Sequence, residues 1–164
     1  MTQLRFDRGQ SGNDSSELAY TVTTAGRGYL DGHKRSFIGY GVGYTSGSVT
    51  DIITFANGGV PNAALDSEGI LEVAKAWNAQ IGLHWNWTLT LSSNASLAYA
   101  ELTEVPEPFE PDFIRTGSSF HLNLIYKFDE RITAGLEYMT GERENVSDRD
   151  GDAQRLQFSL FYYF

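Results

Sequence analysis

The chain ends on a strand that alternates apolar and polar side chains up to its last residue. From Gln154 onward, one face of this strand would carry Leu156, Phe158, Leu160, Tyr162 and Phe164. The other face would carry Arg155, Gln157 and Ser159. A soluble domain rarely ends on an aromatic strand without a polar tail, whereas the strands of an outer-membrane barrel turn apolar side chains toward lipid. This end of the chain therefore predicts a transmembrane β-barrel.

The same two-residue period recurs through most of the interior sequence, and it is typical of strands. Ile132, Ala134, Leu136 and Tyr138, for example, alternate with polar residues or glycine. We predict eight antiparallel strands, several of them long enough to cross a bilayer at a tilt. They cover residues 3–9, 17–30, 34–46, 73–86, 89–102, 118–128, 131–144 and 153–164.

The expected connections alternate between short and long. Short turns are predicted at Asp31-Gly32, near residues 86–88 and at Asp129-Glu130. The longer loops are expected at 10–16, 47–72, 103–117 and 145–152, and they contain Pro61, Pro106, Pro108 and Pro111. Short turns on one side and long loops on the other are typical of outer-membrane barrels.

The longest loop, 47–72, leaves two interpretations open. Residues 49–55 either extend a strand above the membrane or fold inward and constrict a pore, and residues 65–73 are compatible with a helix.

Composition excludes several classes of protein. The 164 residues carry a formal net charge of −9 and no cysteine, and a nucleic-acid binder would need a basic surface instead. No apolar run is long enough for a transmembrane helix, and Met1 is not followed by a signal peptide. A soluble β-sandwich or lipocalin-like barrel is the main alternative, but its apolar face would be packed with aliphatic rather than aromatic side chains.

The sequence predicts no cofactor, no metal site and no enzyme. His33, His84 and His121 lack metal-ligand spacing. The run that begins at Asp148 resembles the start of a calcium loop, but Ser159 stands where that loop needs a carboxylate. There is no nucleophile with a neighbouring base, and an outer-membrane enzyme would need a convergent catalytic set at the rim.

Alternation also assigns side chains to the inside of the barrel, where positive charge would favour the entry of anions. If the last hairpin is centred near Arg149, Arg143 and Arg155 face each other. The residues that we expect to line the pore or to contact solute are Arg143, Arg155, Arg27, Arg5, Glu137, His121, Asn123 and Gln157. Further charges expected inside are Arg35, Lys127 and Asp7.

The end of the chain resembles the DcaP-like porins. The resemblance rests on two segments, and Ser92 in the second departs from the family, which often has arginine there. The first runs from Gly141 through Arg143 and Asn145 to Gly151, Arg155 and the terminal Tyr163-Phe164. The second consists of His84-Trp85-Asn86-Trp87, Leu91-Ser92-Ser93-Asn94 and Tyr99.

This resemblance implies an all-β, 16-stranded antiparallel barrel in the outer membrane of a Gram-negative bacterium. Such porins are homotrimers, lie among lipid and lipopolysaccharide, and allow small anionic solutes to diffuse through. Since residues 1–164 supply about eight strands, the chain is expected to be the C-terminal half of a larger porin barrel. The alternative is a single small, closed eight-stranded barrel with a structural or adhesive role and no channel, because its interior would be filled by side chains.

Overall fold

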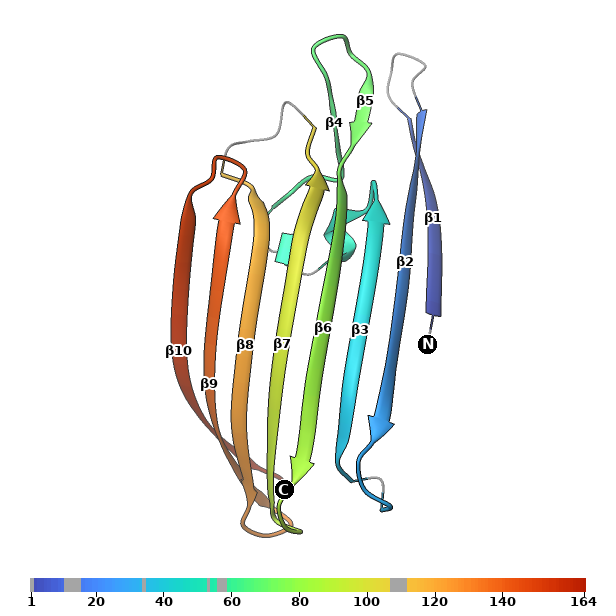
Figure 1. Cartoon of the computed structure of the whole chain (residues 1–164). Helices are drawn as coiled ribbons and strands as arrows, with labels where there is room; N and C mark the ends of the chain where they lie inside the picture. The colour runs from blue at the N-terminus through green and yellow to red at the C-terminus, as the bar shows by residue number, and fades with distance from the viewer. Residues whose placement is uncertain (1, 11–15, 34, 53, 56–58, 107–111) are drawn as a thin grey trace.

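A computed structural model shows one large antiparallel sheet and one small hairpin (Figure 1). It describes residues 2–10, 16–33, 35–52, 54–55, 59–106 and 112–164, with side chains from residue 17 onward. The large sheet has the order β1-β2-β3-β6-β7-β8-β9-β10. Its strands are β1 (Thr2–Gln10), β2 (Ser16–Tyr29), β3 (Phe37–Ser46), β6 (Lys75–Asn86), β7 (Leu91–Glu104), β8 (Ile114–Lys127), β9 (Ile132–Asn145) and β10 (Asp150–Tyr162).

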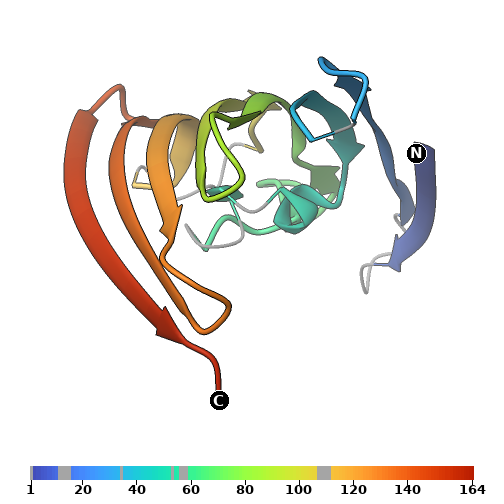
Figure 2. The same ribbon diagram turned by 90° about the horizontal axis from the view of Figure 1, so that it is seen from below.

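The sheet curves into an open trough rather than a closed barrel (Figure 2). Its two edge strands, β1 and β10, each have one neighbour in the sheet and do not pair with each other. The eight-stranded closed barrel considered from the sequence is therefore wrong for this fold. The predicted all-β antiparallel architecture is confirmed, with eight strands in the large sheet. No helix in the described ranges is long and apolar enough to cross a membrane.

The convex face of the trough is apolar and exposed. On β10, for example, the exposed fractions of Leu156, Phe158 and Leu160 are 70%, 69% and 62%. The ladders place Trp77 and Trp85 on this face of β6, and at about 3.3 Å per residue they are roughly 26 Å apart. This spacing matches the apolar band of an outer-membrane barrel, which is about 25 Å tall and is bordered by aromatic girdles.

The polar tips of the girdle residues find partners on the same face. Trp77 Nε1 and the Tyr99 hydroxyl both donate to Glu101 Oε2, at 3.2 and 3.3 Å. At the other end of the strands, Trp87 Nε1 donates to Ser93 Oγ at 3.0 Å. Tryptophan and tyrosine suit a membrane interface because one end of the ring is apolar and the other forms hydrogen bonds.

Strand boundaries differ from the prediction mainly at the end with long loops. β8 begins at Ile114 and β10 at Asp150, both earlier than expected, so the wall extends further above the apolar band. The link between β9 and β10 is therefore a short turn over residues 146–149 rather than the long loop predicted. Pro61 and Pro106 lie outside the strands, as predicted. Pro108 and Pro111 fall outside the described residues.

The segment between β3 and β6 folds into the trough at its start (Figure 2), and its second half rises past the ends of the wall strands (Figure 1). It contains η1 (Val49–Asp51) and a hairpin formed by β4 (Ala63–Leu65) and β5 (Leu71–Val73). The helix expected over residues 65–73 is wrong, because Asp66 Oδ1 accepts the N–H groups of Glu68 and Ile70 and closes a turn there. Of the two interpretations of residues 49–55, the structure supports inward folding.

A small hydrophobic core attaches this inward loop to the concave face of the wall. Val49, Ile52, Phe55 and Val60 from the loop are buried together with wall residues of β6 and β7. These wall residues are Ala76, Ala100 and Leu102. Small wall side chains leave room for the loop, and a Cβ atom added to Gly117 on β8 would lie only 2.7 Å from Thr54 Cγ2. Asp51 Oδ2 also accepts a hydrogen bond from Thr21 Oγ1 on β2 at 3.0 Å.

The turn between β2 and β3 is closed by a carboxylate. Asp31 accepts the backbone N–H groups of Arg35 (2.8 Å) and Ser36 (3.0 Å), and the turn covers residues 30–36. The two-residue turn predicted at Asp31-Gly32 is therefore wrong. Chiefly the Arg35 N–H group, and then that of Ser36, hold the pKa of Asp31 below its ordinary value, because they bind the charged form.

Replacing Asp31 with alanine is expected to remove the protection of the Arg35 and Ser36 amides against hydrogen exchange at neutral pH. In the unchanged protein, the carboxylate contributes fully above the ordinary aspartate pKa of about 3.9. Because its folded-state pKa is lowered, that contribution is lost as the pH falls through the lowered value. Exchange measured by mass spectrometry checks both effects.

The turn at Asp129 provides an internal reference, since its carboxylate accepts the N–H groups of Arg131 and Ile132 in the same way. The protection of the Arg131 and Ile132 amides against hydrogen exchange should not change in Asp31→Ala. Unchanged protection of the Arg35 and Ser36 amides in that variant would contradict the role assigned to Asp31.

Candidate functional site: the concave wall

Two neighbouring rows of side chains cross the concave face from β2 to β10, and the register of the ladders defines them. The arginine row has a basic residue at each end and consists of Arg27, Gly39, Gly82, Ser96, His121, Met139 and Arg155. The amide row lies next to it, toward the short turns, and consists of Tyr29, Phe37, His84, Asn94, Asn123, Glu137 and Gln157.

Hydrogen bonds join the middle of the amide row. Asn94 Nδ2 donates to Asn123 Oδ1 at 2.8 Å, and Asn94 Oδ1 lies 2.7 Å from His84 Nδ1. On the other side of the imidazole, Asn86 Nδ2 lies 3.0 Å from His84 Nε2. Since an amide oxygen only accepts and an amide nitrogen only donates, the network assigns the proton to Nδ1. The network therefore fits a neutral His84 ring in a fixed orientation.

Aromatic rings and a guanidinium form a stack at the β2 end of the two rows. The rings of Phe37 and His84 are stacked, with centroids 5.2 Å apart and planes inclined by 30°. The guanidinium carbon of Arg27 lies 5.2 Å from the centroid of the Tyr29 ring and 5.7 Å from that of Phe37. Both distances are in the range of cation–π contacts. These contacts position Arg27 without neutralising its charge.

At the β10 end, the two rows contain a contact between His121 and Glu137, and Arg155. His121 Nδ1 lies 3.3 Å from Glu137 Oε1, and both side chains are partly exposed. Gln157 Nε2 donates to Ser159 Oγ at 3.2 Å. Within the described residues, no carboxylate pairs with Arg27, Arg143 or Arg155. Within the described part of the chain, no ion pair therefore offsets the positive charge of these three guanidinium groups.

Arg143 and Arg155 share the concave face but are not opposite each other. Arg143 is paired with Gly151, and Arg155 with Met139, so that the two arginines are four residues apart along the strands, or about 13 Å. The predicted facing pair is therefore wrong. The hairpin turns earlier than a centre at Arg149 requires, because Asp148 adopts a positive φ of 58° and its N–H group bonds to the Asn145 carbonyl.

The remaining predicted residues fall in three places. Lys127 is paired with Thr133 on the concave face, next to the short turns. Arg35 lies in the turn before β3 and not in the wall. Arg5 and Asp7 belong to β1, and the ladder pairs them with Thr21 and Ala19, but their side chains lie outside the described residues.

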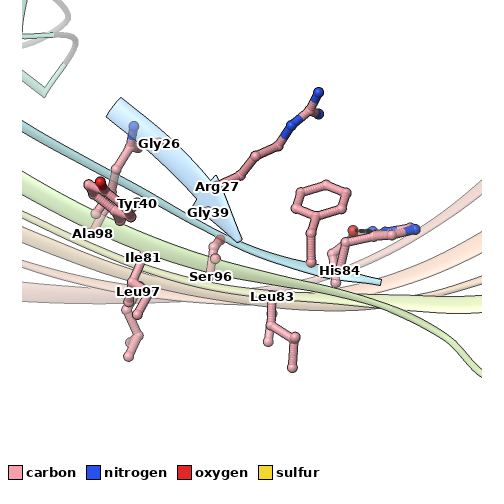
Figure 3. Close-up of a pocket in the computed structure, with 15 residues that line it drawn as sticks. Gly26, Arg27, Gly39, Tyr40, Ile81, Leu83, His84, Ser96, Leu97 and Ala98 are labelled. Carbon is pink, nitrogen blue, oxygen red and sulfur yellow. Dashed lines mark hydrogen bonds between the residues drawn. The ribbon is translucent and has the colours of Figure 1, made fainter. Parts of the chain in front are cut away.

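A hollow of about 460 Å³ lies over the β2 half of the arginine row (Figure 3). Gly39 and Gly82 are in its lining, together with Ser96 and Ala98 from β7. The side chains of Arg27, Phe37, Gln80, His84 and Asn94 also line it. Figure 3 shows Ile81, Leu83 and Leu97 pointing to the opposite side of the sheet from Arg27, so these residues contribute their backbone to the floor.

The turn after Asn145 forms two ion pairs, one with β8 and one with the segment before it. Asp148 pairs with Arg115 at 3.2 Å, and Arg149 pairs with Asp112. A search of the described residues finds no group of three or more histidine, aspartate and glutamate side chains that could hold a metal ion.

Reasoning from the sequence identified Arg27, His121, Asn123, Glu137, Arg155 and Gln157, which all lie in the two rows. It did not identify Tyr29, Phe37, His84 and Asn94 as site residues, although the period-2 glycines Gly39, Gly41 and Gly43 do predict room on one face of their strand. The position of His84 between Leu83 and Trp85 is a usable signal for the face on which it lies, whereas Asn94 follows Ser93 and gives a weaker one. The stack on Arg27 depends on the pairing of β2 with β3, which the sequence does not specify.

No protein-family model and no curated protein matches this sequence. The fold does match a solved structure, the outer membrane channel DcaP of Acinetobacter baumannii, with a TM-score of 0.80 and 14% sequence identity. The match covers 98% of this chain but only 45% of the DcaP chain, so this chain spans less than half of that channel. The resemblance found in the sequence is confirmed at the level of the fold: the eight strands have the antiparallel β-barrel architecture of part of the DcaP channel.

Proposed function

We propose that this chain forms part of the wall of an outer-membrane porin through which small anionic solutes diffuse passively. One observation carries the proposal: the convex face is apolar, whereas the concave face is polar and has a loop folded against it. A soluble β-domain has the opposite arrangement, with its apolar face inside. The likeness to the DcaP channel supports the same function.

Charge on the concave face supports anions as the solute class. Arg27, Arg143 and Arg155 have no carboxylate partner among the described residues. Arg143 shares a register row with Gly117 and Ala100, the wall residues under the inward loop. It therefore lies at the level where that loop narrows the trough. Fixed positive charge at a narrow point raises the local concentration of anions.

Removing two of these charges tests the solute class. In Arg143→Gln/Arg155→Gln, we expect the anion-to-cation permeability ratio to fall several-fold toward unity, because the local potential at the narrow point decreases. The measurement is the reversal potential in a salt gradient across a planar bilayer that contains the complete gene product.

The double variant Arg131→Gln/Arg149→Gln is the matched control. It removes the same net charge from the two turns that flank β9, outside the wall. An equal change in both double variants, or no change in either, would rule out anion selection by the concave arginines.

We propose that the protein lies in the bacterial outer membrane, with lipid and lipopolysaccharide against its convex face. We also propose that it forms a trimer, as the sequence resemblance implies. No covalent chemistry is proposed. Sequencing the native gene upstream of Met1 tests whether this chain is part of a larger porin. A signal peptide followed by about eight more alternating strands is the expected result, and a signal peptide joined directly to these eight strands would contradict it.

A further inference from the structure

We propose that the hollow beside Arg27 is a solute-binding site for small planar carboxylates that carry an aromatic ring, of the size of benzoate. This inference deepens the proposed function and rests on it for the route by which the solute arrives. Three features support it: the flat floor of the hollow, the charge of Arg27 at its edge, and the aromatic rings beside it.

The floor of the hollow is flat because two adjacent positions in the arginine row are glycine. Gly39 and Gly82 are paired across β3 and β6, and Ser96 follows on β7. A Cβ atom at Gly39 would meet only Gly26 O at 3.8 Å, and one at Gly82 would meet nothing closer than 3.6 Å. Packing of the wall therefore does not require these glycines. Their absent side chains leave peptide planes open, on which a flat ring can lie.

Arg27 supplies the charge that a carboxylate needs. Its guanidinium is held by the faces of Tyr29 and Phe37, and no carboxylate among the described residues pairs with it. Guanidinium donors match a carboxylate in a fork geometry. Because ring contacts already fix the guanidinium, binding costs little conformational entropy.

The neighbouring rings and amides favour an aromatic solute over an aliphatic one. Phe37 and His84 line the hollow as one stacked pair of rings. The edge of an aromatic ring is electropositive and its face is negative, so edge-to-face contact with a solute ring is favourable. Gln80 and Asn94 border the same space with amide groups that can bind polar substituents.

Binding can be measured without any current, by saturation-transfer NMR of benzoate with the complete gene product in detergent micelles. Cyclohexanecarboxylate is the comparison ligand, because it has the same charge and a similar size but is not planar. We expect benzoate to bind several-fold more tightly. Equal binding of the two would overturn the planar class.

Two pairs of variants locate the site. Arg27→Gln should weaken benzoate binding by about tenfold, since a charge-assisted hydrogen bond is lost. Arg131→Gln removes the same charge from the turn between β8 and β9, outside the wall, and should leave binding nearly unchanged. Gly39→Ala should weaken binding several-fold by raising the floor. Gly135→Ala, on the concave face of β9 with a similarly open Cβ position, should not.

Equal losses in Arg27→Gln and Arg131→Gln would mean that general charge attracts benzoate, and they would overturn the site. Unchanged binding in Gly39→Ala would also overturn it. Neither result affects the porin proposal, which is tested by conductance to chloride. Absence of that conductance would overturn the porin proposal, whereas benzoate binding with the expected variant pattern would still establish the site.

Discussion

Replacing Phe55 with alanine is expected to detach the inward loop from the wall and to widen the conducting path. The Phe55 side chain is completely buried, and it packs with Val49, Ile52 and Val60 in the core that attaches the loop. Truncating a buried phenylalanine costs about 3–5 kcal/mol, a large fraction of what so small a core supplies. We expect a higher single-channel conductance and faster proteolysis of residues 47–74 in the complete gene product.

Leu65→Ala provides the control within the same loop. Leu65 lies on β4 and is 48% exposed, so its truncation removes a similar apolar side chain without opening the core. Its conductance and proteolysis rate should stay at the level of the unchanged protein. If Phe55→Ala behaves like Leu65→Ala in both measurements, this core does not hold the loop in place.

Gly47→Ala is expected to disturb the point at which the chain leaves β3 and turns inward. Gly47 has a φ of +70°, which a residue with a Cβ atom adopts at a cost of about 1–3 kcal/mol. An added Cβ would also lie 3.0 Å from Ala19 Cβ and 3.2 Å from Ala19 Cα. Overpacking adds about 1–3 kcal/mol, so the loop should lose its position and the unfolding midpoint in urea should fall.

Gly59→Ala separates backbone strain from crowding. Gly59 has nearly the same φ, +71°, but a Cβ atom there meets nothing within 4 Å. Its replacement should cost only the backbone term, so the urea midpoint should fall less than in Gly47→Ala. Equal shifts for the two variants would show that contact with Ala19 does not matter.

The sequence predicts the faces of this sheet well, because alternation is a local property. Leu156, Phe158 and Leu160 are exposed on the convex face as predicted, and Arg155 and Gln157 lie on the other face. Faces depend only on counting residues along one strand, and the wall strands keep their period except at register shifts near Lys75 and near Ile114. The number of strands in the large sheet was therefore predictable from the sequence as well, whereas β4 and β5 were not predicted.

What the sequence did not predict depends on contacts between distant segments. The distance between Arg143 and Arg155 follows from the φ of Asp148 in the turn, which no periodicity shows. The inward direction of the loop follows from burial of Phe55 in one core with wall residues such as Ala76 on β6. The stack of Arg27 on Phe37 likewise requires the register between β2 and β3.

The two open edges of the sheet determine when these strands can enter a lipid bilayer. On β10, the backbone N–H and C=O groups of every second residue point away from β9, and β1 has the same arrangement on its outer side. Each such group left unpaired in hydrocarbon costs several kcal/mol, and a strand of 13 residues carries many of them. In the proposed outer-membrane barrel, insertion before the edges are paired is therefore strongly unfavourable. Pairing of the two edges and insertion of the strands are expected to be coupled.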